Sequence, residues 1–282
     1  MRSRRATESL FKALMIISLA VVLTTLAGII FIILVKGAPA LTLSMLIETP
    51  KGGYYLGKGG GIANAIVGSL YLSLGASIIS ILLSLPAAFA LQKEYANRHI
   101  ANFTRLTLDV LWGTPSIVYG AFGFVVMIYF GLRASLLGGI IVLTLLMLPI
   151  MVRSMEEVIR MIPLELKEIS YALGATKLET TFSVILRQAL PGIVTAVLLA
   201  FGRGIGDAAS ILFTAGYTDY IPRSLFDPVA SLPLAVFFQI GTPSPEVQER
   251  AYASALILLV IILIVCVVSR LLGRRFSKHI VR

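Results

Sequence analysis

Long apolar runs with few or no charged residues recur along the chain. They predict membrane-spanning helices over about residues 11–35, 65–91, 110–132, 134–152, 189–216 and 251–272. A helix rises about 1.5 Å per residue, so a run of about 20 residues crosses a hydrocarbon core about 30 Å thick. The run from Leu232 to Gly241 is too short to span, and we expect it to form an interfacial or re-entrant segment. The pattern predicts an all-α integral membrane fold with six transmembrane helices, built as one domain over residues 1–282.

The composition supports a membrane protein. Hydrophobic residues make up 57% of the 282 residues and charged residues 13%, whereas an ordinary soluble domain has about 25% charged residues. The formal net charge of +10 is spread over loops without interleaved aromatic residues, which argues against nucleic acid as a partner. The single cysteine, Cys266, excludes an internal disulfide and a cysteine-rich metal site. We expect no catalytic residues, no metal and no cofactor.

The distribution of lysine and arginine predicts the orientation. An even number of spans places both termini on one side of the bilayer. The basic residues are concentrated at the two termini, in the loop between the second and third predicted spans, and in residues 153–188. Because cytoplasmic loops are enriched in lysine and arginine, we predict cytoplasmic termini and a multi-pass protein in the lipid of a bacterial or archaeal plasma (inner) membrane.

The segment between the fourth and fifth predicted spans, residues 153–188, is patterned as two short amphipathic helices. Pro163 marks a helix start, and Gly174 stands where a glycine often ends a helix. Thr176 and Glu179 have the spacing of a capping box at the start of a second helix. Two helices bent at a glycine form a knob that either enters a groove of another protein or packs on its own bundle. The pattern alone leaves both alternatives open.

Two charges interrupt the fifth predicted span, in the run GRGIGDAASILF. A charge at the bilayer centre costs about 2.5–3.5 kcal/mol on insertion scales, so Arg203 and Asp207 need shelter or a partner. They are four residues apart, on one helix face, and can neutralise each other. One hypothesis is an ion pair that fixes helix packing, helped by Gly202 and Gly206 at GxxxG spacing. The other is that Arg203 faces a translocation path, where its guanidinium fork binds an anion.

The run EISYALGATKLETTFSVILRQALPGIVTAVLLAFGRGIGDAASILFTAG resembles the EAA loop and following helix of type I ABC importer permeases. Within that family it is most similar to permeases of phosphate-specific transport (Pst) systems, of the PstA type. The runs GGGIANAIVGSLYLSL, WGTPSIVYGAFGF and LPIMVRSMEEVIRMIP extend the resemblance over nearly the whole chain from about Gly59. The loop reads EIS in place of EAA, Arg187 stands where many relatives have proline, and Asp207 replaces a glutamate.

The resemblance implies a non-catalytic permease subunit that forms half of the translocation path of an ATP-driven phosphate importer. The implied partners are a PstC-like sister permease, two copies of a PstB-like cytoplasmic ATPase and a PstS-like phosphate-binding protein. The residues implied to couple to the ATPase are Glu168, Ala172, Gly174 and Ala175. The candidates for the substrate path are Arg203, Asp207, Ser116 and Tyr119.

Other functions remain open at this point. An arginine in the path does not distinguish tetrahedral anions, so a sulfate or molybdate permease is an alternative. A secondary carrier or channel is a further alternative, but only one predicted span holds charged groups away from its ends and no inverted repeat is evident. That the partner is a sister permease, and not a second copy of this chain, rests on the resemblance.

Overall fold

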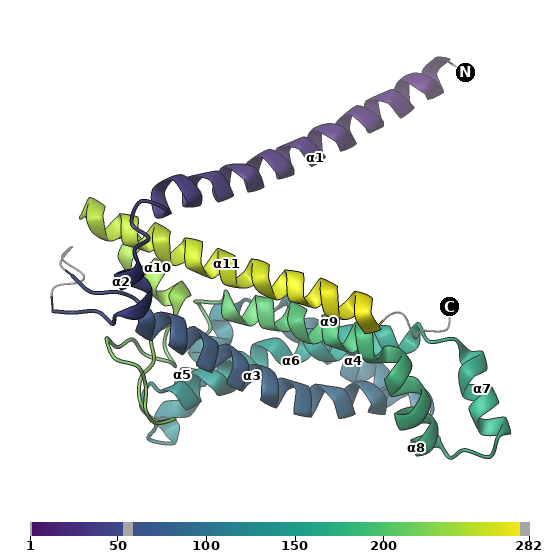
Figure 1. Ribbon diagram of the computed structural model, residues 1–282. Helices are drawn as coiled ribbons and strands as arrows, with labels where there is room; N and C mark the ends of the chain where they lie inside the picture. The colour runs from purple at the N-terminus through teal and green to yellow at the C-terminus, as the bar shows by residue number, and fades with distance from the viewer. Residues whose placement is uncertain (1, 53–58, 277–282) are drawn as a thin grey trace.

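The computed structural model describes residues 2–52 and 59–276, and these residues form helices joined by turns and irregular segments (Figure 1). Five helical stretches are long and apolar enough to cross a membrane. They are α1 (Arg2–Gly37), α3 (Ala63–Ala90), α6 (Leu136–Arg160), α9 (Leu186–Ile205) with the turns before it, and α11 (Pro245–Phe276). A bent helix pair is the sixth candidate. The predicted all-α membrane fold is confirmed.

The predicted span 110–132 is not one continuous helix. The chain forms α4 (Arg98–Gly113) and α5 (Ser116–Tyr129), whose axes differ by 99°. Pro115 lies at the break, and the residue before a proline is driven out of the helical region, so Thr114 is extended with φ −72° and ψ 130°. The Tyr119 hydroxyl donates a hydrogen bond across the break to the Leu111 carbonyl, at 2.8 Å.

Helix α9 ends at Ile205, well before the end of the predicted span 189–216. Gly206 follows as the C-cap, and Oδ1 of Asp207 accepts a hydrogen bond from the Ser210 amide at 2.8 Å. A short polar side chain that bonds to the backbone in this way competes with helix continuation. Residues 206–231 are therefore irregular although largely apolar, and several are buried: Ile211, Thr214, Ala215, Val229 and Ala230.

The irregular segment supplies hydrogen-bond acceptors to helix starts. The amides of Leu136 and Leu137, in the first turn of α6, donate to the carbonyls of Asp227 and Leu225, both at 2.8 Å. These first-turn amides have no partner within their own helix, so the segment satisfies them inside the protein. The segment leads into α10 (Leu232–Ile240), whose 9 residues are too few to span, as predicted for this run.

Helix α6 lies at the centre of the bundle and is the most buried candidate span. Met147, Met151, Met155 and Ile159 form its fully buried face. Small and hydroxyl side chains let α3 approach α6 closely: the Thr144 hydroxyl of α6, which donates a hydrogen bond to the Ile140 carbonyl at 2.8 Å, lies 3.4 Å from the Ala76 carbonyl of α3.

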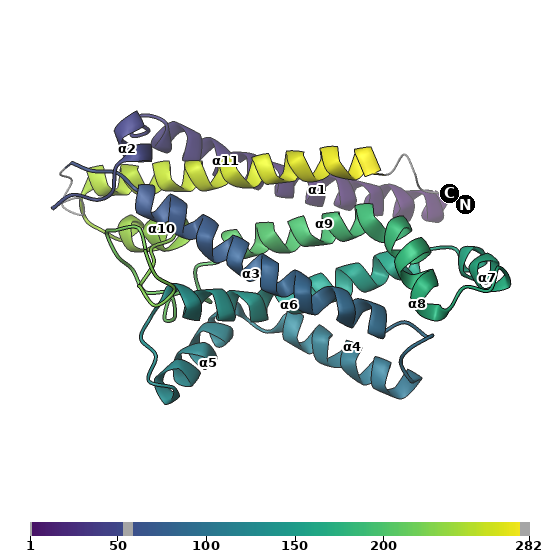
Figure 2. The ribbon, with the colours of Figure 1, turned by 60° about the horizontal axis from the view of Figure 1, so that its bottom comes forward.

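Helix α1 leans away from the bundle and contacts it mainly near Gly37, beside the Tyr252 backbone of α11 (Figure 1). Figure 2 places the start of α1, the end of α11 and the helices α7 (Leu164–Ala172) and α8 (Lys177–Thr180) at the same end of the molecule. We call this the coupling end.

Close packing of α3 on the irregular segment predicts a sensitive glycine. A Cβ on Gly68 would overlap the Ala230 carbonyl oxygen and the Val229 side chain. We expect Gly68→Ala to destabilise the protein by about 1–3 kcal/mol through overpacking. Thermal unfolding of the purified chain in detergent measures this. Gly28→Ala is the control, since a Cβ there meets nothing within 4 Å; equal midpoints for both variants would contradict the packing argument.

Candidate functional site

Helices α7 and α8 with the turn between them form the coupling segment, residues 162–180. Pro163 caps the start of α7, and Gly174 ends it with φ +83°, a left-handed conformation that favours glycine. The Thr176 hydroxyl accepts from the Glu179 amide at 3.3 Å, and the Glu179 carboxylate accepts from the Thr176 amide at 2.8 Å. The predicted C-cap glycine and capping box are confirmed.

Most apolar residues of the coupling segment face away from the bundle, whereas Ile162 packs against the hydrophobic core and Leu166 is half-buried. Leu173 is 84% exposed, and Leu164, Ile169 and Leu178 are also exposed. The fully buried residues of the segment are polar, namely Lys167, Ser170 and Thr180, and the hydroxyls of Ser170 and Thr180 lie 2.8 Å apart. An exposed apolar face of this kind is typical of a protein-binding surface. Of the two alternatives for the knob, the geometry favours the groove of another protein.

The loop between α3 and α4 anchors the coupling segment. Nζ of Lys167 lies 2.8 Å from Oε1 of Glu94, and the Lys177 ammonium donates to the Glu94 carbonyl at 3.2 Å. Burial by itself raises the pKa of Glu94, but the hydrogen bond from Lys167 and the charges of Lys167 and Lys93 outweigh it and lower the pKa below 4.5. Glu94 is therefore ionised at neutral pH, and the pair holds α7 against the membrane helices.

The second helix of the coupling segment is not separate from the membrane helix. Helix α8, a π-helical turn η2 (Thr181–Ile185) and α9 follow one another without a break, so Lys177–Ile205 forms one stretch of 29 residues. At about 1.5 Å per residue it is about 42 Å long. One helical element thus connects the coupling segment to Arg203, near its far end.

The two charges of GRGIGD form an ion pair at the end of α9. Nη2 of Arg203 lies 3.4 Å from Oδ2 of Asp207. The Asp207 side chain is 3% exposed and also bonds to the Ser210 amide, whereas the Arg203 side chain is 52% exposed. The carboxylate is therefore held in the protein, and the guanidinium has donors free to meet another group.

Helix α5 packs beside this charge pair. A Cβ on Gly120 would lie 2.8 Å from the carbonyl oxygens of Ala209 and Ser210, which follow Asp207. Ser116 is the half-buried first residue of α5, and the buried Tyr119 directs its hydroxyl to the α4–α5 break. The structure therefore brings α5 close to the turn after α9. Glu168, Ala172 and Gly174 are exposed and Ala175 is half-buried at the coupling end, remote from this pair.

A buried carboxylate that the sequence analysis did not single out connects α4 to α6. Glu156 is fully buried, and its oxygens lie 2.6 Å from Nε of Arg105 and 2.7 Å from Nη1 of Arg153. Arg153 also pairs with Asp109 at 2.8 Å. The sequence did contain a signal for this site: Arg153 stands three residues before Glu156, a spacing that places both on one helix face, and Arg105 and Asp109 lie on a preceding helix. The described residues contain no group of three or more His, Cys, Asp or Glu side chains that could hold a metal.

The family model described as "binding-protein-dependent transport system inner membrane component" matches residues 80–282, which include α4–α6, the coupling segment and α9. The chain belongs to this family. It is 32% identical over 269 residues to the phosphate transport system permease protein PstA of Yersinia pestis, covering 94% of this chain and 90% of that protein. It is 33% identical over 262 residues to PstA 1 of Mycobacterium tuberculosis, covering 92% and 86%.

The fold is also that of solved importer chains. A chain of the MetNI methionine ABC transporter, described as inward facing, matches with a TM-score of 0.63 at 17% identity, covering 80% of this chain and 99% of that chain. The protein is thus a multi-pass inner membrane permease, a transport subunit rather than an enzyme.

The anchor of the coupling segment can be tested by hydrogen exchange. Glu94→Gln removes the charge that Lys167 pairs with, so we expect amides of α7 to exchange several-fold faster in the full chain at neutral pH. Because the folded pKa of Glu94 is lowered, the pair stabilises at pH above the ordinary carboxyl pKa and is lost as pH falls through the lowered value. Glu165→Gln, on the exposed side of α7, is the control; unchanged exchange in Glu94→Gln would refute the anchor.

Proposed function

We propose that this permease forms half of the translocation path of an ATP-driven phosphate importer. The observation that carries the proposal is the continuous helix Lys177–Ile205, which has an exposed apolar docking surface at its start and a half-exposed arginine near its end. The similarity to PstA proteins over more than nine-tenths of the chain supports phosphate as the substrate.

The proposed complex contains a PstC-like sister permease, two PstB-like ATPases and a PstS-like binding protein. In the proposed orientation the coupling end, which holds the start of α1 and the end of α11, faces the cytoplasm, in agreement with the enrichment of lysine and arginine there (Figure 2). The ATPase docks on the exposed apolar residues of the coupling segment around Glu168, Ala172, Gly174 and Ala175, and the binding protein delivers phosphate at the opposite end.

Two contacts transmit movement of the ATPase. A displacement of the coupling segment is passed on to α9, because no break separates α8, η2 and α9. The same displacement pulls on Glu94 through Lys167 and so moves the loop between α3 and α4. Both routes connect the cytoplasmic knob to helices that border the path.

Arg203 suits a phosphate oxyanion in transit. Its guanidinium presents a donor fork that matches two phosphate oxygens, while Asp207 holds one side of it and weakens binding enough for release. Asp207 and the half-buried Ser116 complete the proposed path on this chain. Tyr119 acts by fixing the α4–α5 break that positions Ser116. Moving a divalent anion inward against 100 mV costs about 4.6 kcal/mol, which requires the external energy of ATP.

Substrate contact by Arg203 is tested in proteoliposomes with the sister permease, the ATPase and the binding protein. We expect Arg203→Ala to reduce phosphate uptake about tenfold or more, because a charged hydrogen-bonding partner of the anion is lost, while ATP hydrolysis continues. Sulfate and molybdate are offered in parallel to define the anion. Unchanged uptake in Arg203→Ala would assign the pair to helix packing alone.

The docking surface is tested by one exposed position. Leu173→Asp places a charge in the proposed ATPase groove without disturbing the fold, since Leu173 is 84% exposed. We expect the ATPase to be lost on co-purification with this variant and retained with Leu173→Met, which preserves the apolar contact. Equal recovery of the ATPase with both variants would place the docking surface elsewhere.

A further inference from the structure

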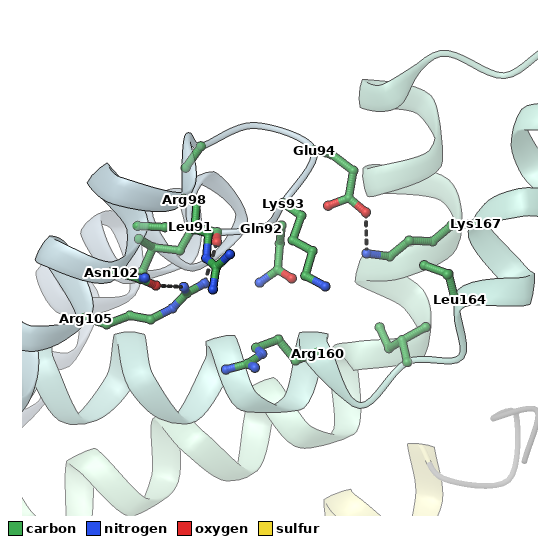
Figure 3. Close-up of a pocket in the computed structure, with 13 residues that line it drawn as sticks. Leu91, Gln92, Lys93, Glu94, Arg98, Asn102, Arg105, Arg160, Leu164 and Lys167 are labelled. Atoms are coloured by element: carbon green, nitrogen blue, oxygen red, sulfur yellow. Dashed lines mark hydrogen bonds and ion pairs between the residues drawn. The ribbon is translucent and has the colours of Figure 1, made fainter.

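A cavity of about 900 Å³ lies at the coupling end, bordered by the loop between α3 and α4, the start of α4, the end of α6 and the start of α7 (Figure 3). Its lining is strongly basic. The charged residues that line it are Lys93, Arg98, Arg105, Arg160, Lys167 and the single acid Glu94.

Two of the five basic residues are already neutralised. Lys167 is paired with Glu94 at 2.8 Å. Arg105 is paired with the buried Glu156 at 2.6 Å, and its other nitrogens donate to the Asn102 side chain and the Leu91 carbonyl. These interactions hold the walls of the cavity in place. The net positive charge of the cavity therefore comes from the remaining three cations.

The other three cations are compensated less fully. Lys93 and Arg98 are exposed and form no salt bridge within the part of the chain that the structure describes. Arg160 forms a solvent-exposed ion pair with Glu157 at 3.4 Å, and water screens an exposed pair of this kind. In Figure 3 Lys93 and Gln92 point into the space from the loop, and Arg160 lies on the opposite wall. Cations from three separate elements therefore converge on one volume.

This arrangement suits a phosphate group. Guanidinium and ammonium groups form short, charge-assisted hydrogen bonds with phosphate oxygens. The first turn of α4, which begins at Arg98, adds the partial positive charge of a helix start. Amide groups of Gln92 and Asn102 in the lining offer additional polar partners.

We propose that this cavity is a binding site for a phosphate group reached from the cytoplasmic side, supplied by inorganic phosphate or by the headgroup of an anionic lipid. Leu164 and Lys167 of α7 form one wall, so the bound group connects the coupling segment to α4 and α6. The exposed apolar residues Ile100 and Phe103 on α4 place lipid within reach of the same site. The proposal does not depend on which anion is transported, because Arg203 lies near the opposite end of α9.

The first arm of the test uses inorganic phosphate. The full chain is placed in nanodiscs of phosphatidylcholine, and equilibrium binding of radiolabelled phosphate is measured. We expect saturable binding that weakens about tenfold or more in the double variant Lys93→Gln/Arg98→Gln. The control, Lys12→Gln/Arg270→Gln, removes two exposed charges outside the cavity and keeps wild-type binding. Arg203→Ala separates any binding at the path from binding at this site.

The second arm uses lipid. The chain is reconstituted with phosphatidylcholine and phosphatidylglycerol, and the phosphatidylglycerol retained after mild delipidation is counted by native mass spectrometry. The cavity variant is the double variant Lys93→Gln/Arg98→Gln. The site is assigned to a lipid headgroup if this variant retains less phosphatidylglycerol than the control and the first arm shows no phosphate binding. If the cavity variant matches the control for both ligands, with thermal stability equal to wild type, the proposal is wrong.

Discussion

Every charge inside or beside the apolar layer needs a partner, and the architecture depends on this constraint most at Glu156. Its carboxylate has no exposure to solvent and is held by Arg105 of α4 and Arg153 of α6. Removing one member of such a buried group costs about 3–5 kcal/mol, because the remaining charge is left without compensation. The group therefore fixes α4 against α6. That arrangement in turn positions the loop between α3 and α4, from which Glu94 reaches the coupling segment.

The need for a partner also applies to the two charges at the C-terminal end of α9, but there only one of them is buried. Asp207 is buried and paired, but Arg203 remains half exposed. Helix α8, η2 and α9 follow one another without a break, and the π-helical turn η2 directly follows the coupling segment. Turns of this type are frequent at functional sites, since they redirect side chains without ending the helix. Arg203 and the second helix of the coupling segment thus belong to one continuous helical stretch.

The features predicted correctly from the sequence are those that depend only on residues close together in the chain. Gly174 and the Thr176–Glu179 capping box require only neighbouring residues, and both were recognised. The contact of Glu94 with Lys167 joins residues 73 positions apart, so it could not be predicted from local sequence patterns. The apolar periodicity of α7 is the same whether that face is packed or exposed, and only the three-dimensional arrangement showed it exposed. The early end of α9 was missed because apolar composition continues to residue 216, whereas helix continuation is decided by Gly206 and by the Asp207 side chain.

The half-exposed Arg203 also bears on assembly. A guanidinium paired on one side, at the end of an apolar helix, remains costly unless another group or water completes its surroundings. Within this chain, Asp207 supplies one face, and α5 reaches the neighbouring turn through Gly120 rather than covering the arginine. The remaining face therefore needs a second protein chain or an aqueous path. In the proposed complex the sister permease and water meet this need together, because the surface of the sister permease closes a hydrated passage over Arg203. On that proposal, a single copy of the chain forms only one wall of the path.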